Sequence, residues 1–469
     1  MTARVAFLCA VGALVAVLAC GCSTQAQADP EPPATSTAVP TPVVIEVTRV
    51  VPVTTTPTPP ATAACPVADS DQLDEIVIGA LLPLSNPGAM RHGFAMQTAL
   101  NIAVDDVNAA GGVLGKTVRL VTYDTSGIPS QGAQMAERLI LEDCARGIVG
   151  LYHSNVASAV SDIAHRYGIP LIIAEASADE LTSSLYAEVF RIAPAFSQLV
   201  EANAAWLSST LDVENLDTRS VVQVVENSAY GQVLMAQNEE WMAKSDIDIK
   251  TILVDLPMRD FSPVIARIVD MDTLPGAIFI YLRNGTGMEF QQQLIDAGIS
   301  PVNGTLLINT EMALDAEQFW STVPDGAYTI VKRNGPWPST VSPVGHAFAE
   351  SYQRYFDMWP ERYAFAAYDA FRLLADAINR ADTLDSPAIV KALERSDVVL
   401  AGGRYMFPFN SSNPPDAETE PPWMWHQWPN VQILFLQYTE PLQPADAMRV
   451  IWPPIYATGS GAIRPLHID

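Results

Sequence analysis

Ser154 is the residue whose type and position most directly suggest chemistry in this chain. It lies between a predicted strand at 147–152 and a predicted helix that begins near residue 156. A serine at such a junction caps the helix, and its hydroxyl and the neighbouring amide groups can bind an anion such as a carboxylate. Its place at the carboxyl end of a strand favours a ligand role. The alternative is a plain helix cap.

Other polar side chains follow the ends of predicted strands in the same way. They are Glu175 and Ser177 after the strand at 170–174, Arg283 and Asn284 after 276–281, and Glu311 after 305–309. The sequence has no nucleophile elbow in a strand–turn–helix context, no H-E-x-x-H, no G-x-G-x-x-G and no phosphate-binding loop. Its 6 histidines are scattered, so we do not expect an enzyme.

The elements that would position these residues begin with one clear unit. Residues 75–84 form a short, nearly unbroken apolar run, which is typical of a strand buried on both faces. Residues 93–108 place apolar side chains every three or four positions, which predicts a helix that ends at Gly111 and Gly112. A second strand follows at 116–124, so the unit is βαβ and implies a parallel sheet.

The rest of the chain continues this alternation as far as residue 331. Three further helices are then predicted, at 344–356, 363–380 and 387–394. The alternation rises and restarts, which favours two doubly wound α/β lobes over one very wide sheet. Two closing strands are expected at 431–438 and 449–452.

The N-terminus is typical of an exported lipoprotein. Its apolar run at 5–18 is too short to cross a membrane comfortably. Small residues precede both Cys20 and Cys22, so 1–22 is predicted to be a lipoprotein signal peptide, with lipidation at Cys20 in preference to Cys22. The alternative is a plain secretory signal that is cleaved near Ala28.

Two further stretches lack the composition of a packed core. Residues 23–70 are rich in Pro, Thr, Ala and Val, which predicts an extended, disordered tether. Residues 456–469 are predicted to form a flexible tail.

The composition bounds the size and the partners of the protein. The chain has 469 residues, enough for two domains with extensions, and its net charge is −26. No basic surface is available to neutralise phosphates, so we expect no nucleic-acid partner and no electrostatic attachment to anionic lipid.

The cysteines leave one question open. Cys9, Cys20 and Cys22 lie in the signal region, so only Cys65 and Cys144 remain for the folded part. Export permits a disulfide between these two. Because Cys65 lies in the predicted tether, the sequence favours two unpaired thiols and leaves the disulfide as the alternative. There is no C-x-x-C spacing, and we expect no metal and no other cofactor.

Several segments, in their order and spacing, resemble one protein family. They are IVIGALLPL at 76–84, NAAGGVLGK at 108–116, the strand ending at Asp124, VGLYHS at 149–154, residues 180–182 and 230–231, and YAFAAYDAFRLL at 363–374. Over about residues 75–455 the chain is similar to the leucine/isoleucine/valine-binding proteins, which are type I periplasmic solute-binding proteins of ABC transporters.

The resemblance implies a type I periplasmic-binding fold, in which two doubly wound parallel-sheet α/β lobes are joined by three crossovers. It places lobe one at 75–194 and 335–402, and lobe two at 197–332 and 404–455. The crossovers are expected at 192–194, at 332–334 and near Gly402 and Gly403. In this family the ligand binds between the lobes and a hinge closes.

The resemblance also implies ligand-binding roles in lobe one. The position of Ser154 binds the ligand carboxylate, and the position of Ser177, a threonine in better-known members, helps to hold a zwitterion. The position of Glu175 is usually small, so a carboxylate there either points away or favours an ammonium-rich ligand or an amide. His92 takes another frequently aromatic position, near the entrance.

In lobe two, Glu311 matches the acidic residue that pairs with the ligand ammonium, and the alternative is a solvated loop carboxylate. Tyr230 matches an aromatic that lines the lobe, and the alternative is packing at a helix start. Arg283 and Asn284 stand where the family often has tyrosine, and Arg283 could bind a second ligand carboxylate or pair with Glu311. These changes suggest a pocket more polar than one built for leucine.

The leading hypothesis is a solute-binding lipoprotein of an ABC importer, anchored to the outer face of the cell membrane. It would capture an amino acid or a related small polar amine or amide and deliver it to a permease. The alternative is a receptor domain that senses a ligand and signals to a membrane partner. The aromatic segment 423–428 could lie over the ligand site, seal the hinge or contact the permease.

Overall fold

The computed structural model describes residue 65 and residues 73–213, 220–283, 285–356 and 358–458. The predicted signal peptide, both candidate lipidation sites Cys20 and Cys22, nearly all of the tether and the tail beyond residue 458 lie outside these residues. Within the described residues, every helix is too short or too polar to cross a membrane.

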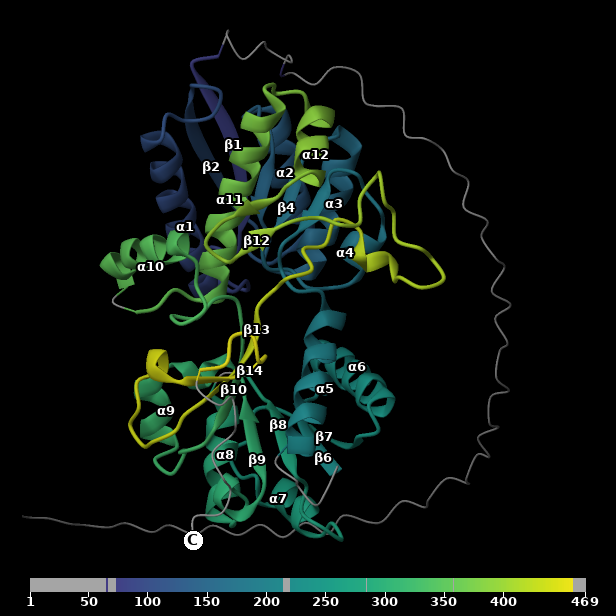
Figure 1. The fold of residues 1–469 in the computed structure, drawn as a ribbon, viewed down its shortest axis with the longest axis vertical. Helices are drawn as coiled ribbons and strands as arrows, with labels where there is room; N and C mark the ends of the chain where they lie inside the picture. Colours follow the sequence, from purple (N-terminus) through teal and green to yellow (C-terminus); the bar gives the residue numbers. More distant parts are fainter. Residues whose placement is uncertain (1–64, 66–72, 214–219, 284, 357, 459–469) are drawn as a thin grey trace, which may run out of the picture. The chain divides into compact units, whose positions relative to one another are not determined.

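The first sheet is parallel throughout, with the strand order β2-β1-β3-β4-β5. Figure 1 labels β1, β2 and β4 of this sheet. Its strands are β1 (Glu75–Leu82), β2 (Thr117–Asp124), β3 (Ile148–Gly150), β4 (Leu171–Ile173) and β5 (Val189–Arg191). The predicted βαβ unit is therefore confirmed. The apolar run of β1 is buried from its second residue to its last, as expected for a strand that is covered on both faces.

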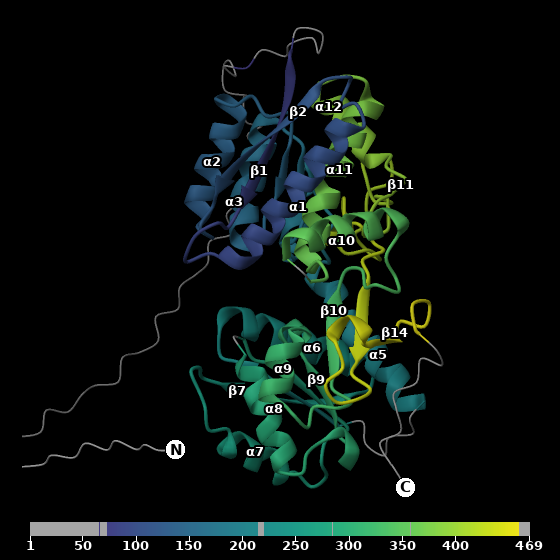
Figure 2. The same ribbon diagram turned by 90° about the vertical axis from the view of Figure 1, so that its left-hand side faces the viewer.

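Helices cover both faces of this sheet. Figure 2 shows α1 and α11 on one side of β1, and α2 and α3 on the other. The helices are α1 (Met90–Ala109), α2 (Pro129–Leu141), α3 (Ser154–Tyr167), α4 (Glu180–Ser183), α10 (Pro343–Phe356), α11 (Arg362–Ala381) and α12 (Ser386–Glu394). We call this sheet and these helices the first lobe.

The second sheet has the order β14-β13-β10-β9-β8-β6-β7. Its strands are β6 (Ser220–Glu226), β7 (Asp248–Val254), β8 (Ala277–Tyr281), β9 (Leu306–Asn309), β10 (Ile330–Asn334), β13 (Ile433–Gln437) and β14 (Arg449–Trp452). The strands from β6 to β10 run parallel, whereas β13 and β14 join as antiparallel closing strands.

The helices of the second sheet are α5 (Phe196–Val213), α6 (Ala229–Lys244), α7 (Ser262–Val269), α8 (Thr286–Asp296) and α9 (Ala316–Thr322). They contribute to separate apolar cores on the sheet, one with Trp206 of α5 and another with Phe290 of α8. We call this sheet and its helices the second lobe. The prediction of two α/β lobes built mainly on parallel sheets is confirmed.

The stretch after the short hairpin of β11 (Val398–Val399) and β12 (Arg404–Tyr405) corrects a predicted boundary. Tyr405, Phe407 and Trp428 lie in the core of the first lobe, so residues 404–428 pack there and not in the second lobe. The chain joins the second sheet only at β13, so the crossover expected near Gly402 and Gly403 comes later, between residue 428 and β13.

Arg191 explains why this stretch stays with the first lobe. Its fully buried guanidinium pairs with the side chain of Gln427, and it donates to Ala178 O at 2.5 Å and Thr182 Oγ1 at 3.1 Å. Trp425 and Trp428 are buried as well. The aromatic segment therefore packs beside β5, and these two rings do not form an outward surface.

Cys65 and Cys144 form a disulfide, with 5.4 Å between their Cα atoms. The preference for unpaired thiols was wrong. The composition around Cys65 does not reveal that this residue lies beside Cys144, but the structure does. The loop of Cys144 itself lies beside the first strand, where Arg146 N donates to Val77 O at 2.9 Å.

Candidate functional site

In the parallel part of each sheet there is one position where successive strands are added on opposite sides. Open α/β sheets bind their ligands at such positions. In the first sheet this position lies between β1 and β3. His92 lies in the first turn of α1, the helix after β1, and Tyr152 follows β3. In the second sheet it lies between β6 and β8, where Glu226 ends β6 and Arg283 follows β8.

His92 is held by aromatic neighbours at the first of these positions. Its Nδ1 lies 2.8 Å from Tyr152 Oη, and its ring stacks on that of Tyr363 with 4.3 Å between centroids. Burial, together with the nearby cations Arg362 and Arg91, lowers the pKa of His92 to about 4. The imidazole is therefore neutral at pH 7 and can take part in hydrogen bonding without adding charge.

Arg362 joins two of the predicted ligand-binding residues. It is the first residue of α11, and its Nη1 forms an ion pair with Glu175 Oε1. Its Nε donates to Glu311 Oε2 at 3.0 Å. Glu175 follows β4 in the first lobe and Glu311 follows β9 in the second. We call Glu175, Glu311 and Arg362 the Arg362 cluster.

The charges in this cluster are strongly coupled by burial. Glu175 is only 6% exposed, and burial raises its pKa to about 7 despite the attraction of Arg362. Burial disfavours the charge of Arg362, but Glu175 and Glu311 outweigh it and raise the pKa of Arg362 well above its usual value. Burial lowers the pKa of the nearby Lys332 to about 7, and Lys332 Nζ donates to Leu199 O at 2.7 Å.

Glu311 is not a solvated loop carboxylate. It begins a short 3₁₀ turn, Glu311–Leu314, and its side chain is 23% exposed. Its Oε1 accepts from Asn334 N at 2.9 Å, and Asn334 is the last residue of β10. A strand of the second lobe and a helix of the first lobe therefore both hold this carboxylate.

The two predicted serines lie at the same edge of the first sheet. Ser154 is the first residue of α3 and His153 is the N-cap, so the prediction that Ser154 caps the helix was wrong. Ser154 Oγ instead accepts from Ala178 N at 3.2 Å, and Ser177 Oγ donates to Glu175 O at 3.2 Å. Both hydroxyls thus bind the loop that carries Glu175. Their ligand roles remain predictions.

One alternative for Arg283 was a pair with Glu311, and this alternative was wrong. Arg283 forms an ion pair with Glu226, which is 3% exposed. Burial would raise the pKa of Glu226, but hydrogen bonds from Arg283 and Ser228 lower it on balance. The Glu226–Arg283 pair therefore places a negative and a positive group at the position of the second sheet where successive strands are added on opposite sides.

Two other predicted residues cannot be placed in full. Tyr230 lies in the first turn of α6, as predicted, but its side chain is not among those described. Asn284 lies outside the described residues. Ser228 is the N-cap of α6 and accepts from Gly231 N at 3.1 Å.

The sequence reasoning missed Arg362, Tyr363 and Tyr152. Tyr152 and Tyr363 lie within segments that carried the family resemblance, but no role was assigned to them. Arg362 did offer a local signal. A cation at the first position of a helix is opposed by the helix dipole, so an arginine there implies carboxylate partners from elsewhere in the chain.

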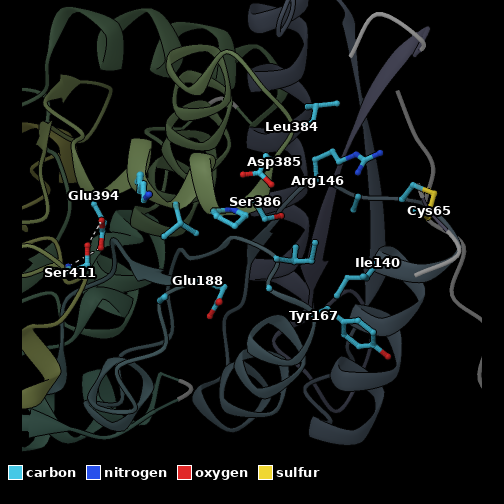
Figure 3. Close-up of a pocket in the computed structure, with 18 residues that line it drawn as sticks. Cys65, Ile140, Arg146, Tyr167, Glu188, Leu384, Asp385, Ser386, Glu394 and Ser411 are labelled. Carbon is cyan, nitrogen blue, oxygen red and sulfur yellow. Dashed lines mark hydrogen bonds between the residues drawn. A yellow bond between two sulfur atoms is a disulfide. The ribbon is translucent and has the colours of Figure 1, made fainter. Parts of the chain in front are cut away.

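A separate cavity of about 540 Å³ lies at the opposite edge of the first sheet. Its lining includes residues that precede β3, β4 and β5, whereas the Arg362 cluster lies beyond the carboxyl ends of the strands. Figure 3 shows Cys65 at one side of it and the hydrogen-bonded pair Glu394 and Ser411 at the other. None of the predicted ligand residues lines this cavity. The described side chains contain no group of three or more potential metal ligands.

Comparisons with known proteins agree with this architecture. The sequence profile of a family described as periplasmic binding protein matches residues 75–430. The Leu/Ile/Val-binding protein BraC3 of Rhizobium johnstonii is 28% identical, over 71% of this chain and 86% of that protein.

Solved structures share the fold. A putative branched-chain amino acid ABC transporter protein of Silicibacter pomeroyi has a TM-score of 0.69 at 21% identity, over 84% of this chain and 100% of that one. The substrate-binding protein LivJ of Streptococcus pneumoniae, in complex with isoleucine, has a TM-score of 0.61 at 21% identity, over 81% and 100%. This chain therefore belongs to the periplasmic binding protein family, whose members bind solutes and are not enzymes, as the sequence predicted.

Proposed function

We propose that this protein is the extracytoplasmic solute-binding component of an ABC importer, and that it binds an amino acid or a related small amine or amide beside the Arg362 cluster. The observation that carries this proposal is the position of Glu311. It lies beyond the end of β9 in the second lobe and reaches Arg362 of the first lobe. The relative named as a Leu/Ile/Val-binding protein and the solved relative that holds isoleucine support an amino-acid ligand.

The residues at this edge offer a partner for each part of a zwitterion. Glu311 can accept hydrogen bonds from the ammonium group. The start of α3, with the hydroxyl of Ser154 and the backbone amides of the first turn, can bind the carboxylate. The rings of His92, Tyr152 and Tyr363, which lie in mutual contact, can pack against the ligand side chain.

The charge balance of the site favours a ligand without net charge. Glu175 and Glu311 stand against Arg362 and Lys332, and the nearby Arg333 stands against Glu361, so these six charges sum to zero. The sum stays zero if Glu175 and Lys332 are both neutral, which matters because both pKa values are near 7. A zwitterion or an amide preserves this balance, whereas a polyamine or a dicarboxylate does not.

The membrane anchor and the permease belong to the same proposal. Lipidation of Cys20, or of Cys22, would attach the protein to the outer face of the cell membrane through the Pro/Thr-rich tether. Mass spectrometry of the N-terminal peptide of the mature protein tests this directly. An unlipidated N-terminus near Ala28 would instead indicate a plain secretory signal.

A thermal-shift screen of the mature protein against amino acids, amides, polyamines and aromatic carboxylates tests the ligand class. A compound that binds only the folded state raises the unfolding midpoint by mass action. We expect zwitterions or amides to raise it, Glu311→Gln to reduce the shift strongly, and the exposed control Glu317→Gln to retain it. A shift with polyamines or aromatic carboxylates alone, or with no compound at all, would contradict the proposed ligand class.

A further inference from the structure

We propose that Arg362 is a bridge between the lobes which the ligand must displace from Glu311. The guanidinium holds Glu311 of the second lobe while it stays paired with Glu175 of the first. When the ammonium group of a ligand binds Glu311, it takes the place of Arg362 Nε. The displacement step rests on the proposed function, but the bridge itself does not.

The two ends of the bridge are fixed in different lobes. Arg362 is followed directly by Tyr363, Ala364 and Phe365, which lie in the apolar core of the first lobe. Glu311 is held in the second lobe by the backbone amide of Asn334 at the end of β10. Arg333 of β10 also donates to Pro360 O at 2.9 Å, just before α11. The hydrogen bond from Arg362 to Glu311 therefore restrains movement between the lobes together with this neighbouring contact.

The two cations cannot share Glu311 at low cost. One carboxylate oxygen already accepts from Asn334 N, and the other accepts from Arg362 Nε at 3.0 Å. An ammonium group bound to the same carboxylate would lie within a few ångströms of the guanidinium, in a partly buried site where like charges repel strongly. The ammonium therefore competes with Arg362 for Glu311.

Glu175 can keep the guanidinium of Arg362 in an ion pair after it leaves Glu311. Its carboxylate pairs with Arg362 Nη1, not with the Nε that bonds Glu311, so this ion pair can persist after the exchange. The guanidinium also lies over the ring of Tyr363, 5.1 Å from its centroid. Glu175 is a positioning residue for Arg362, not a ligand contact.

The bridge can be tested without any ligand. Bio-orthogonal spin labels at positions 105 and 267, which are exposed on α1 and α7, report the distance between the lobes in the mature protein by pulsed electron resonance. We expect a broader distance distribution in Arg362→Gln than in the wild type or in the exposed control Arg395→Gln. Equal distributions in all three proteins would overturn the bridge.

A second variant guards against misfolding. If Arg362→Gln leaves the buried Glu175 unpaired and fails to fold, Glu311→Gln breaks the same contact from the second lobe and leaves the pair of Arg362 with Glu175 intact. It should broaden the distribution in the same way. An unchanged distribution in Glu311→Gln would also overturn the bridge.

Calorimetry with leucine as the probe tests the displacement. Because Arg362 competes with the ammonium, Arg362→Gln combined with Glu175→Gln should bind leucine about tenfold more tightly than the wild type. Weaker binding would mean that Arg362 contacts the ligand, and would overturn the displacement. If the wild type does not bind leucine but the label distances change as expected, the bridge stands and the proposed ligand fails. If leucine binds but the label distances do not change in the variants, the proposed ligand stands and the bridge fails.

Discussion

At the scale of single residues, the raised pKa of Glu175 makes stability depend on pH in a defined direction. Burial raises that pKa to about 7, so the folded state prefers the protonated carboxyl. The contribution of Glu175 to the free energy of unfolding is therefore complete below its ordinary pKa of about 4.5. This contribution is lost as the pH rises through 7. Replacement by glutamine removes this dependence.

We predict that Glu175→Gln gains stability relative to the wild type as the pH rises from 5 to 8, by about 2–3 kcal/mol. Urea unfolding at both pH values measures the difference. The exposed control Glu201→Gln should follow the wild type at both. A Glu175→Gln variant with the same pH dependence as the wild type would show that the native carboxyl is not perturbed.

Single residues also show what the sequence can and cannot predict about the site. Glu175 and Glu311 could be singled out because each directly follows a strand, and strand ends are visible in the local pattern. That Arg362 would bond to Glu311 could not be predicted, because the contact joins two lobes and depends on how they pack. Ser154 was placed in the right loop, but the helix begins one residue earlier than a serine cap requires.

At the scale of elements, the disulfide ties the start of the folded chain to the loop before β3. Its cysteines are 79 residues apart, so the cross-link removes much conformational freedom from the unfolded chain. We predict that Cys144→Ser lowers the free energy of unfolding by about 2–4 kcal/mol. Denaturation with and without a reductant measures this. The reductant should destabilise the wild type and leave the variant unaffected, and equal stability of the two oxidised proteins would contradict the prediction.

The segment beside β5 depends on the pairing of Arg191 with Gln427. We predict that Gln427→Leu costs about 1–3 kcal/mol, because it removes a buried acceptor from a buried guanidinium. Thermal unfolding compares it with Gln232→Leu, an exposed position on α6, which should change little. If both variants have the wild-type midpoint, the pairing does not stabilise this segment.

Elements whose apolar residues recur at a regular spacing were mostly predicted, whereas segments without such a spacing were not. Most strands and helices up to about residue 394 follow from apolar runs and from spacings of three or four residues, but β5, α4 and α9 were not predicted. Residues 404–428 have no such spacing, so their lobe could not be assigned from the sequence. Their place is decided by the buried contacts of Phe407, Trp428 and Gln427.

At the scale of the whole molecule, residues beyond the carboxyl ends of strands in both sheets meet in one charged cluster. Glu175 follows a strand of the first sheet, Glu311 follows a strand of the second, and Arg362 begins α11. The order of strands and helices was enough to predict two lobes, because the alternation restarts partway along the chain. The family was predicted from the resemblance of motifs such as those at 76–84, 108–116 and 363–374. The charge of the site follows only from the assembled structure, since it depends on which carboxylates share Arg362.

Calorimetric titration of the mature protein with the best amino acid or amide from the screen tests the central claim most directly. If Glu311 binds the ligand ammonium, Glu311→Gln should weaken binding on the order of 50-fold, while the exposed control Glu317→Gln binds as the wild type does. Wild-type affinity in Glu311→Gln would contradict the account, because it would place the ligand away from the residue that joins the two lobes.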